Sequence, residues 1–128
     1  MILNMDGTKP IYVQISEWLE GEILNGQFGP EQKIYSQYQL ADIFTINPAT
    51  AAKGLNRLVD EGILYKKRGL GMFVTTSAQA LIRSKRKNQT LKQLMMELVA
   101  EAKYLNLSES ELLALVKATI TEMWGEGQ

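Results

Sequence analysis

Residues 47–74 read NPATAAKGLNRLVDEGILYKKRGLGMFV, and this stretch decides the fold. Asn47 supplies a capping side chain and Pro48 tolerates a first helical turn, so we expect a helix to start there and run to about residue 60. The β-prone runs ILY and MFV follow, and the segment KKRGLG between them carries the glycines of a hairpin loop. The stretch therefore predicts a helix and then a β-hairpin with a basic tip.

Two further helices are predicted upstream of this stretch. Pro10 suits a first turn, and isoleucine and leucine recur at four-residue spacing over residues 11–25. Ser36 can cap a short helix over residues 37–43, and a two-residue connection joins it to the third helix. Three helices and a hairpin, with a very short turn between the second and third helices, is the element order of a winged helix-turn-helix. The expected fold class is mainly α, with the hairpin as the wing.

The chain after residue 75 is expected to be helical, because it lacks proline and has glycine only at positions 125 and 127. We expect a winged domain over residues 1–75 and a helical segment over 76–128, with one helix from about 77 to 105 and a second after the break Asn106-Leu107-Ser108. Its apolar stripes exceed what a small domain needs to cover, which indicates a surface that pairs two copies. The alternative is that the tail folds back onto its own winged domain. The expected dimer contacts are Leu91, Leu94, Met95, Leu98, Val99, Ala102, Leu105, Leu112, Val116, Ile120 and Met123.

The composition excludes several kinds of chemistry. The chain has neither cysteine nor histidine, which removes disulfides, thiolate zinc sites, thiol nucleophiles and the commonest general base. Its net charge is zero, but residues 33–87 hold ten lysines and arginines against three acidic residues. This middle region is the part that can attract phosphate.

The third helix is expected to have an apolar inside and a basic outside. On a helical wheel, Thr50, Lys53 and Arg57 lie opposite the leucines of the stretch. A helix in the major groove reads bases with its first turn, so Asn47, Ala49 and Thr50 are expected near bases. Lys53 and Arg57 are expected near phosphates, and Lys53 could also reach a guanine. The alternative for this face is a merely solvated surface.

The basic hairpin tip favours DNA over that alternative. Lys66, Lys67 and Arg68 could lie over the backbone or enter the minor groove, although lysines also protect exposed strand edges. Two basic surfaces beside one short helix together indicate a duplex partner. Arg83, Lys85, Arg86 and Lys87 could add phosphate contacts, although such a run is more often simply solvated.

Residues 10–74 resemble the DNA-binding domain of GntR-family bacterial regulators. The carriers are PIYVQI at the first helix, Ser36 with Leu40-Ala41, NPAT, EGILY and above all the closing RGLGMFV. The short helical tail most resembles the YtrA-type branch. The resemblance implies a repressor that acts as a homodimer on a palindromic operator, with a transporter operon as a possible target. Implied DNA contacts are Ser36, Gln37, Tyr38, Asn47, Pro48, Ala49, Thr50, Lys53, Arg57, Lys67, Arg68 and Gly69.

Two departures from the family pattern shift the expected readout. The basic residue common after the start of helix two is missing from the segment IYSQY at residues 34–38, and Pro48 and Ala49 occupy a turn that often carries arginine. Asn47, Thr50, Lys53 and Tyr38 become the expected readers.

Other functions remain as alternatives. A winged-helix protein-interaction module is the main one, and RNA binding is a lesser variant because the A-form major groove is narrow. An enzyme is disfavoured, since Asp60 and Glu61 cannot face one cavity as an acid and base pair. We expect no cofactor, no metal, no membrane span and a cytoplasmic location. A small-molecule effector, if one binds, is expected between the winged domain and the tail.

Overall fold

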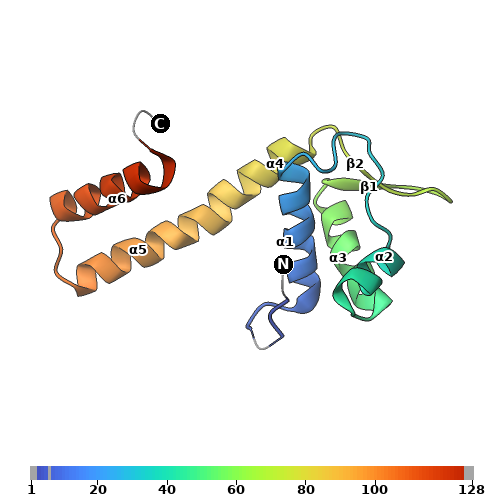
Figure 1. The fold of residues 1–128 in the computed structure, drawn as a ribbon, viewed down its shortest axis with the longest axis horizontal. Coiled ribbons are helices and arrows are strands. Elements are labelled where there is room, and N and C mark those ends of the chain that lie inside the picture. The colour runs from blue at the N-terminus through green and yellow to red at the C-terminus, as the bar shows by residue number, and fades with distance from the viewer. Residues whose placement is uncertain (1–2, 6, 126–128) are drawn as a thin grey trace. The chain divides into compact units, whose positions relative to one another are not determined.

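The structure, a computed structural model, describes residues 3–5 and 7–125. The chain divides into a first unit, Met1–Lys85, and a second unit, Arg86–Gln128. The boundary lies ten residues beyond the expected one at residue 75, because the helix that follows the wing packs into the first unit. Figure 1 labels the elements of both units.

The three helices predicted for the winged domain are present and begin at the expected caps. They are α1 (Ile11–Leu24), α2 (Gln37–Phe44) and α3 (Pro48–Asp60). Ser36 and Gln39 form a reciprocal capping box at the start of α2, and Thr45 ends that helix in the left-handed conformation, with φ of 53°. This sharp turn leaves only residues 45–47 between α2 and α3, as a helix-turn-helix requires.

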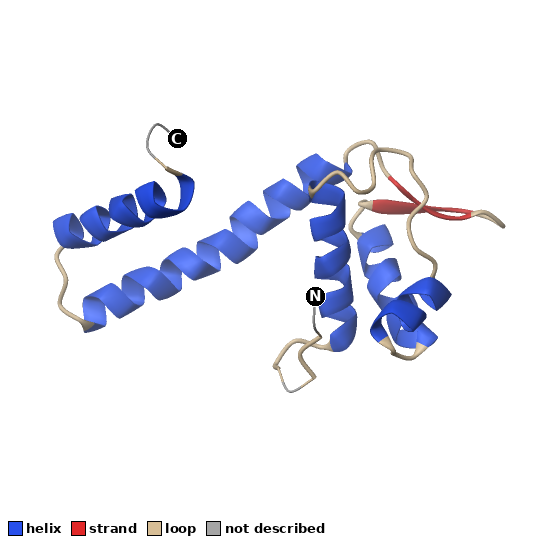
Figure 2. Cartoon of the chain, in the orientation of Figure 1, coloured by secondary structure: helices blue, strands red, loops and turns tan. Residues whose placement is uncertain are grey.

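The wing is a two-stranded antiparallel hairpin of β1 (Leu64–Lys67) and β2 (Gly71–Val74). Leu64 pairs with Val74 at its base and Lys67 with Gly71 at its end, so the turn holds only residues 68–70 (Figure 2). Two of the three basic residues expected at the tip therefore lie in a strand. The predicted fold class, mainly α with this hairpin as its wing, is confirmed.

The first unit is held together by the packing of α1 against α3, which lie side by side in Figure 1. Gly54 stands where the helices meet, and a Cβ there would lie 2.9 Å from the Tyr12 carbonyl oxygen and 3.2 Å from Ile15. The buried Ser16 hydroxyl donates a 2.7 Å hydrogen bond to the Gly54 carbonyl across the same contact. The surrounding core consists of Ile15, Leu19, Ile23, Ile34, Leu40, Ala51, Leu55, Leu58, Ile63, Leu64, Val74, Ala78 and Ile82.

An ion cluster around the buried Glu20 carboxylate joins the end of α4 (Ala78–Lys85) to α1 and to the turn after α3. The Lys85 ammonium forms an ion pair with Glu20, whose side chain is 1% exposed, and a second one with Glu61 at 3.0 Å. Ile82 on the same helix is fully buried in the core. Lys85 thus has two carboxylate partners within the first unit, and its side chain is 18% exposed.

The second unit contains the π-helical segment η1 (Arg86–Leu91), then α5 (Lys92–Tyr104) and α6 (Glu109–Trp124). The sequence predicted one uninterrupted helix over residues 77–105. The structure differs from this prediction at the π-helical segment. Asn106, with φ of 59°, makes the predicted break. Hydrogen bonds from the Ser108 backbone and hydroxyl at the start of α6 hold the pKa of Glu111 below its ordinary value. Among the described residues, no helix has the length and hydropathy to cross a membrane.

Most apolar side chains of the second unit are exposed. Among the eleven residues expected to contact a second copy, Ala102 is buried within its own unit and Leu112 and Val116 are half-buried. The others are exposed, as Leu94 at 56% and Leu105 at 57% illustrate. An apolar pocket of about 360 Å³ lies between α5 and α6. The second unit thus presents a large apolar surface that its own helices leave open.

Substituting Gly54→Ala should destabilise the first unit by about 1–3 kcal/mol, because the new methyl group forces α1 and α3 apart. Gly21→Ala is the matched control, since a Cβ at this helical position meets nothing within 4 Å. It should stabilise the protein by about 0.5–1 kcal/mol through the higher helix propensity of alanine. Urea unfolding measures both, and equal effects of the same sign would contradict the close contact.

Substituting Lys85→Met should lower the free energy of unfolding by about 3 kcal/mol, because the Glu20 carboxylate is left buried without its partner. The double variant Glu20→Leu/Lys85→Met removes both charges and should recover most of that loss. Lys9→Met, which breaks the exposed pair with Glu17, is the control and should cost less than about 1 kcal/mol. Unfolding followed by Trp18 fluorescence in a Trp124→Phe background tests this. Equal losses in the Lys85→Met and Lys9→Met variants would contradict it.

Candidate nucleic-acid interface

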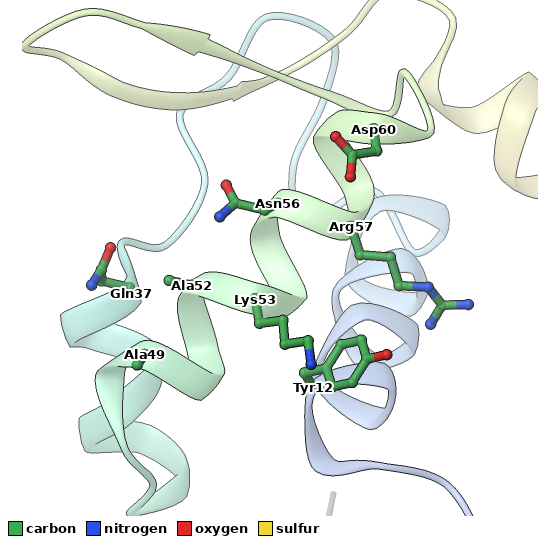
Figure 3. A pocket seen from close by; sticks show the side chains of 8 residues that line it. All are labelled: Tyr12, Gln37, Ala49, Ala52, Lys53, Asn56, Arg57 and Asp60. Carbon is green, nitrogen blue, oxygen red and sulfur yellow. The ribbon is translucent and has the colours of Figure 1, made fainter.

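The outward side of α3 forms a shallow groove of about 610 Å³ with the start of α2 (Figure 3). Four neutral residues lie together on the side of α3 that faces away from α1. Gln37 comes from the first turn of α2, and Ala49, Ala52 and Asn56 follow α3. We call these four residues the amide–methyl face. Among the described residues, the side-chain amides of Gln37 and Asn56 form no hydrogen bond with the protein.

The two cations of α3 lean toward α1 instead (Figure 3). The Lys53 ammonium lies 4.2 Å from the centre of the Tyr12 ring, in a cation–π contact. The Arg57 side chain is half-buried, and its Nη1 is shielded from solvent without a hydrogen-bond partner among the described residues. The basic outside predicted for α3 is therefore one flank of the helix, while its outermost side is neutral.

A second groove, of about 710 Å³, separates the start of α2 from the wing. Ser36, Gln37 and Tyr38 line one wall, and residues 66–72 of the hairpin line the other. Gln37 lines both grooves, so the two adjoin at the start of α2. Lys33 adds a cation to this surface that the sequence reading did not single out.

The wing presents its charges in two different ways. Lys67 lies over the aromatic pair of β1 and β2, with its ammonium 4.5 Å from the Phe73 ring centre and 5.8 Å from that of Tyr65. Arg68 is exposed in the turn, and Gly69 beside it has φ of 77°, a conformation that suits glycine. The Lys67 ammonium thus lies against the strands, whereas the Arg68 guanidinium is exposed at the tip of the wing.

Several of the residues expected to contact DNA form the N-terminal caps of α2 and α3. The Asn47 side chain accepts a 2.8 Å hydrogen bond from the Ala49 amide, and the Ser36 hydroxyl accepts one from Gln39. Pro48 and Thr50 are half-buried, whereas the Tyr38 side chain is 67% exposed and borders the second groove. Ser36, Asn47 and Pro48 therefore shape the start of each helix, and Tyr38 is open to a partner.

Ala52 and Asn56 also line the first groove, although they were not among the contacts expected from the sequence. The expected outside of α3 was defined by its charged residues, and these two residues are neutral. Their positions three and seven residues after Ala49 place all three on one side of a helix. The helical wheel alone could have found them.

The charges along α3 favour binding of a polyanion near the middle of this helix and disfavour it at the end of the helix. Asp60 closes the first groove at the end of α3, where its charge repels phosphate. Lys33 lies in the loop before α2, Lys53 on α3 and Arg68 in the turn of the wing. Among residues 3–5 and 7–125, no cluster of three or more acidic, histidine or cysteine side chains could hold a metal ion.

Residues 11–74 match the family described as bacterial regulatory proteins, gntR family. HTH-type transcriptional repressor NagR of Bacillus subtilis (strain 168) is 39% identical over 75 residues, which are 59% of this chain and 31% of NagR. HTH-type transcriptional repressor YtrA of the same organism is 28% identical over 116 residues, which are 91% of this chain and 88% of YtrA. The chain thus spans under a third of the length of NagR and most of the length of YtrA.

Solved structures show a similar fold over most of the chain. A putative transcriptional regulator of the GntR family from Bacteroides thetaiotaomicron superposes with a TM-score of 0.75 at 31% identity, covering 88% of this chain and 98% of that one. The structure of AraR(DBD) in complex with operator ORX1 superposes with a TM-score of 0.54 at 30% identity, covering 59% and 93%.

Proposed function

Since the chain belongs to the gntR family of bacterial regulatory proteins, which are transcriptional regulators and not enzymes, we propose that it represses transcription by binding an operator as a homodimer. One observation carries the proposal. Two grooves, one along the outward side of α3 and one between α2 and the wing, adjoin at Gln37 and include Lys33, Lys53 and Arg68 in their lining. A surface of this kind can accept the phosphate backbone of a duplex.

The recognition helix of this proposal is α3, whose first turns enter the major groove. Lys53 on one flank and Arg68 in the wing contact the phosphates on either side, and Arg68 can also reach the adjacent minor groove. Asp60 directs the duplex toward the start of the helix. Occupation of an operator that overlaps a promoter then excludes polymerase without any reaction, and a chromosomal partner implies a cytoplasmic location.

The homodimer is supported by the open apolar surface of the second unit. This unit has 43 residues, close to the size below which a fold needs disulfides, a metal or a partner chain. The chain has no cysteine, and exposed leucines and methionines cover α5 and α6. A second copy offers a surface of the same chemistry by two-fold symmetry, which matches two winged units to a palindromic site with half-sites about 34–36 Å apart.

DNA binding is tested by a gel shift with the promoter region of the protein's own gene, titrated with salt and competitor DNA. Binding should weaken steeply with salt. Lys53→Gln or Arg68→Gln should each make the negative slope of log K against log[salt] shallower by about 0.9, the contribution of one lost phosphate contact. Lys117→Gln, an exposed lysine on α6, is the control and should leave the slope unchanged. Absence of specific binding by the unmodified protein, or unchanged slopes in both variants, would contradict the assignment.

Dimerisation is tested by sedimentation of the Leu94→Asp variant, since a charge in the proposed apolar interface should raise the dimer dissociation constant by at least about ten-fold. Gln93→Asp introduces the same charge at a neighbouring exposed position and should leave the dimer intact. A monomeric unmodified protein at micromolar concentration, or a dimer that withstands Leu94→Asp as well as it withstands Gln93→Asp, would remove this part of the proposal.

A further inference from the structure

We propose that the amide–methyl face reads A·T base pairs and that α3 makes no guanine contact through a cation. The inference rests on the proposed DNA binding and adds to it the class of sequence that is recognised. It assigns base-reading roles to Gln37 and Asn56, and thymine contacts to Ala49 and Ala52. Its starting observation is the separation in Figure 3 between these four residues and the cations of the same helix.

The cations of α3 are held away from the side that meets the bases. Lys53 is engaged with the ring of Tyr12 on α1, and the Arg57 guanidinium leans the same way with Nη1 shielded from solvent. Arginine and lysine are the usual partners of the guanine O6 and N7 atoms. With both side chains drawn toward α1, the centre of α3 lacks the groups that recognise G·C pairs most strongly.

The neutral side chains that remain have the chemistry for A·T pairs. A side-chain amide donates to N7 and accepts from the N6 amino group of adenine, and a methyl group packs against the C5-methyl of thymine. The amides of Gln37 and Asn56 are free of protein hydrogen bonds, unlike those of the capping residues Gln39 and Asn47. The two alanines between them leave room for a thymine methyl to approach the helix.

The length of the face sets the number of base pairs. Ala49 and Asn56 are seven residues apart, which is about 10 Å along a helix. This corresponds to about three base pairs at 3.4 Å each. We therefore expect a run of about three A·T pairs near the centre of each half-site.

The test selects half-sites from a randomised palindrome with the full chain and then replaces single bases in the selected duplex. Deoxyuridine in place of thymidine removes the C5-methyl group and should weaken binding about three- to five-fold at each contacted position. Replacing adenine by 7-deaza-adenine removes N7 and should weaken binding about ten-fold at positions that face an amide. Asn56→Ala and Gln37→Ala should reduce the preference for A·T over G·C at one position each by about ten-fold or more.

Gln27→Ala, at an exposed loop position after α1, is the matched amide control and should keep the full preference. A selected half-site with G·C pairs at its centre, or a preference that survives both Gln37→Ala and Asn56→Ala, would overturn the inference while leaving specific DNA binding in place. A protein that binds no duplex even at low salt would overturn both proposals.

Discussion

The close approach of α1 and α3 at Gly54 determines how α3 is oriented in the first unit. The absence of a side chain there brings the Tyr12 carbonyl and the Ser16 hydroxyl against the backbone of α3. This contact fixes the rotation of α3, so Leu55 and Leu58 point into the core and Asn56 points away from it. It also brings the ring of Tyr12 within reach of Lys53. One steric constraint thus orients both the neutral outward side of the helix and its basic flank.

The second constraint is charge buried between elements. Lys85 forms ion pairs with Glu20 on α1 and with Glu61 just after α3. Without the Lys85 ammonium, the carboxylates of Glu20 and Glu61 would repel each other. The cluster holds the end of α4 to the winged unit, beside the apolar anchor Ile82. A basic residue that reads as a surface charge in the sequence is therefore part of the interior.

The helices and hairpin of the first unit could be predicted because their signals are local. Ser36 and Asn47 are capping residues at short range, and the glycines of the hairpin stand where the chain turns. The orientation of Lys53 and Arg57 could not be predicted, since it depends on Tyr12, about forty residues earlier, and on packing that a helical wheel does not contain. The π-helical segment over Arg86–Leu91 carries no proline or glycine signal, and the sequence therefore predicted an ordinary helix.

The exposed leucines and methionines of α5 and α6 have a consequence for the lifetime of the chain. A protein that holds such side chains in water is a substrate for chaperones and for proteases that degrade unassembled chains. In the homodimer proposed above, a second copy would cover these side chains, to an extent that rises with concentration. The cell would then hold few solitary chains, and the amount of regulator available to promoters would rise more steeply than its rate of synthesis.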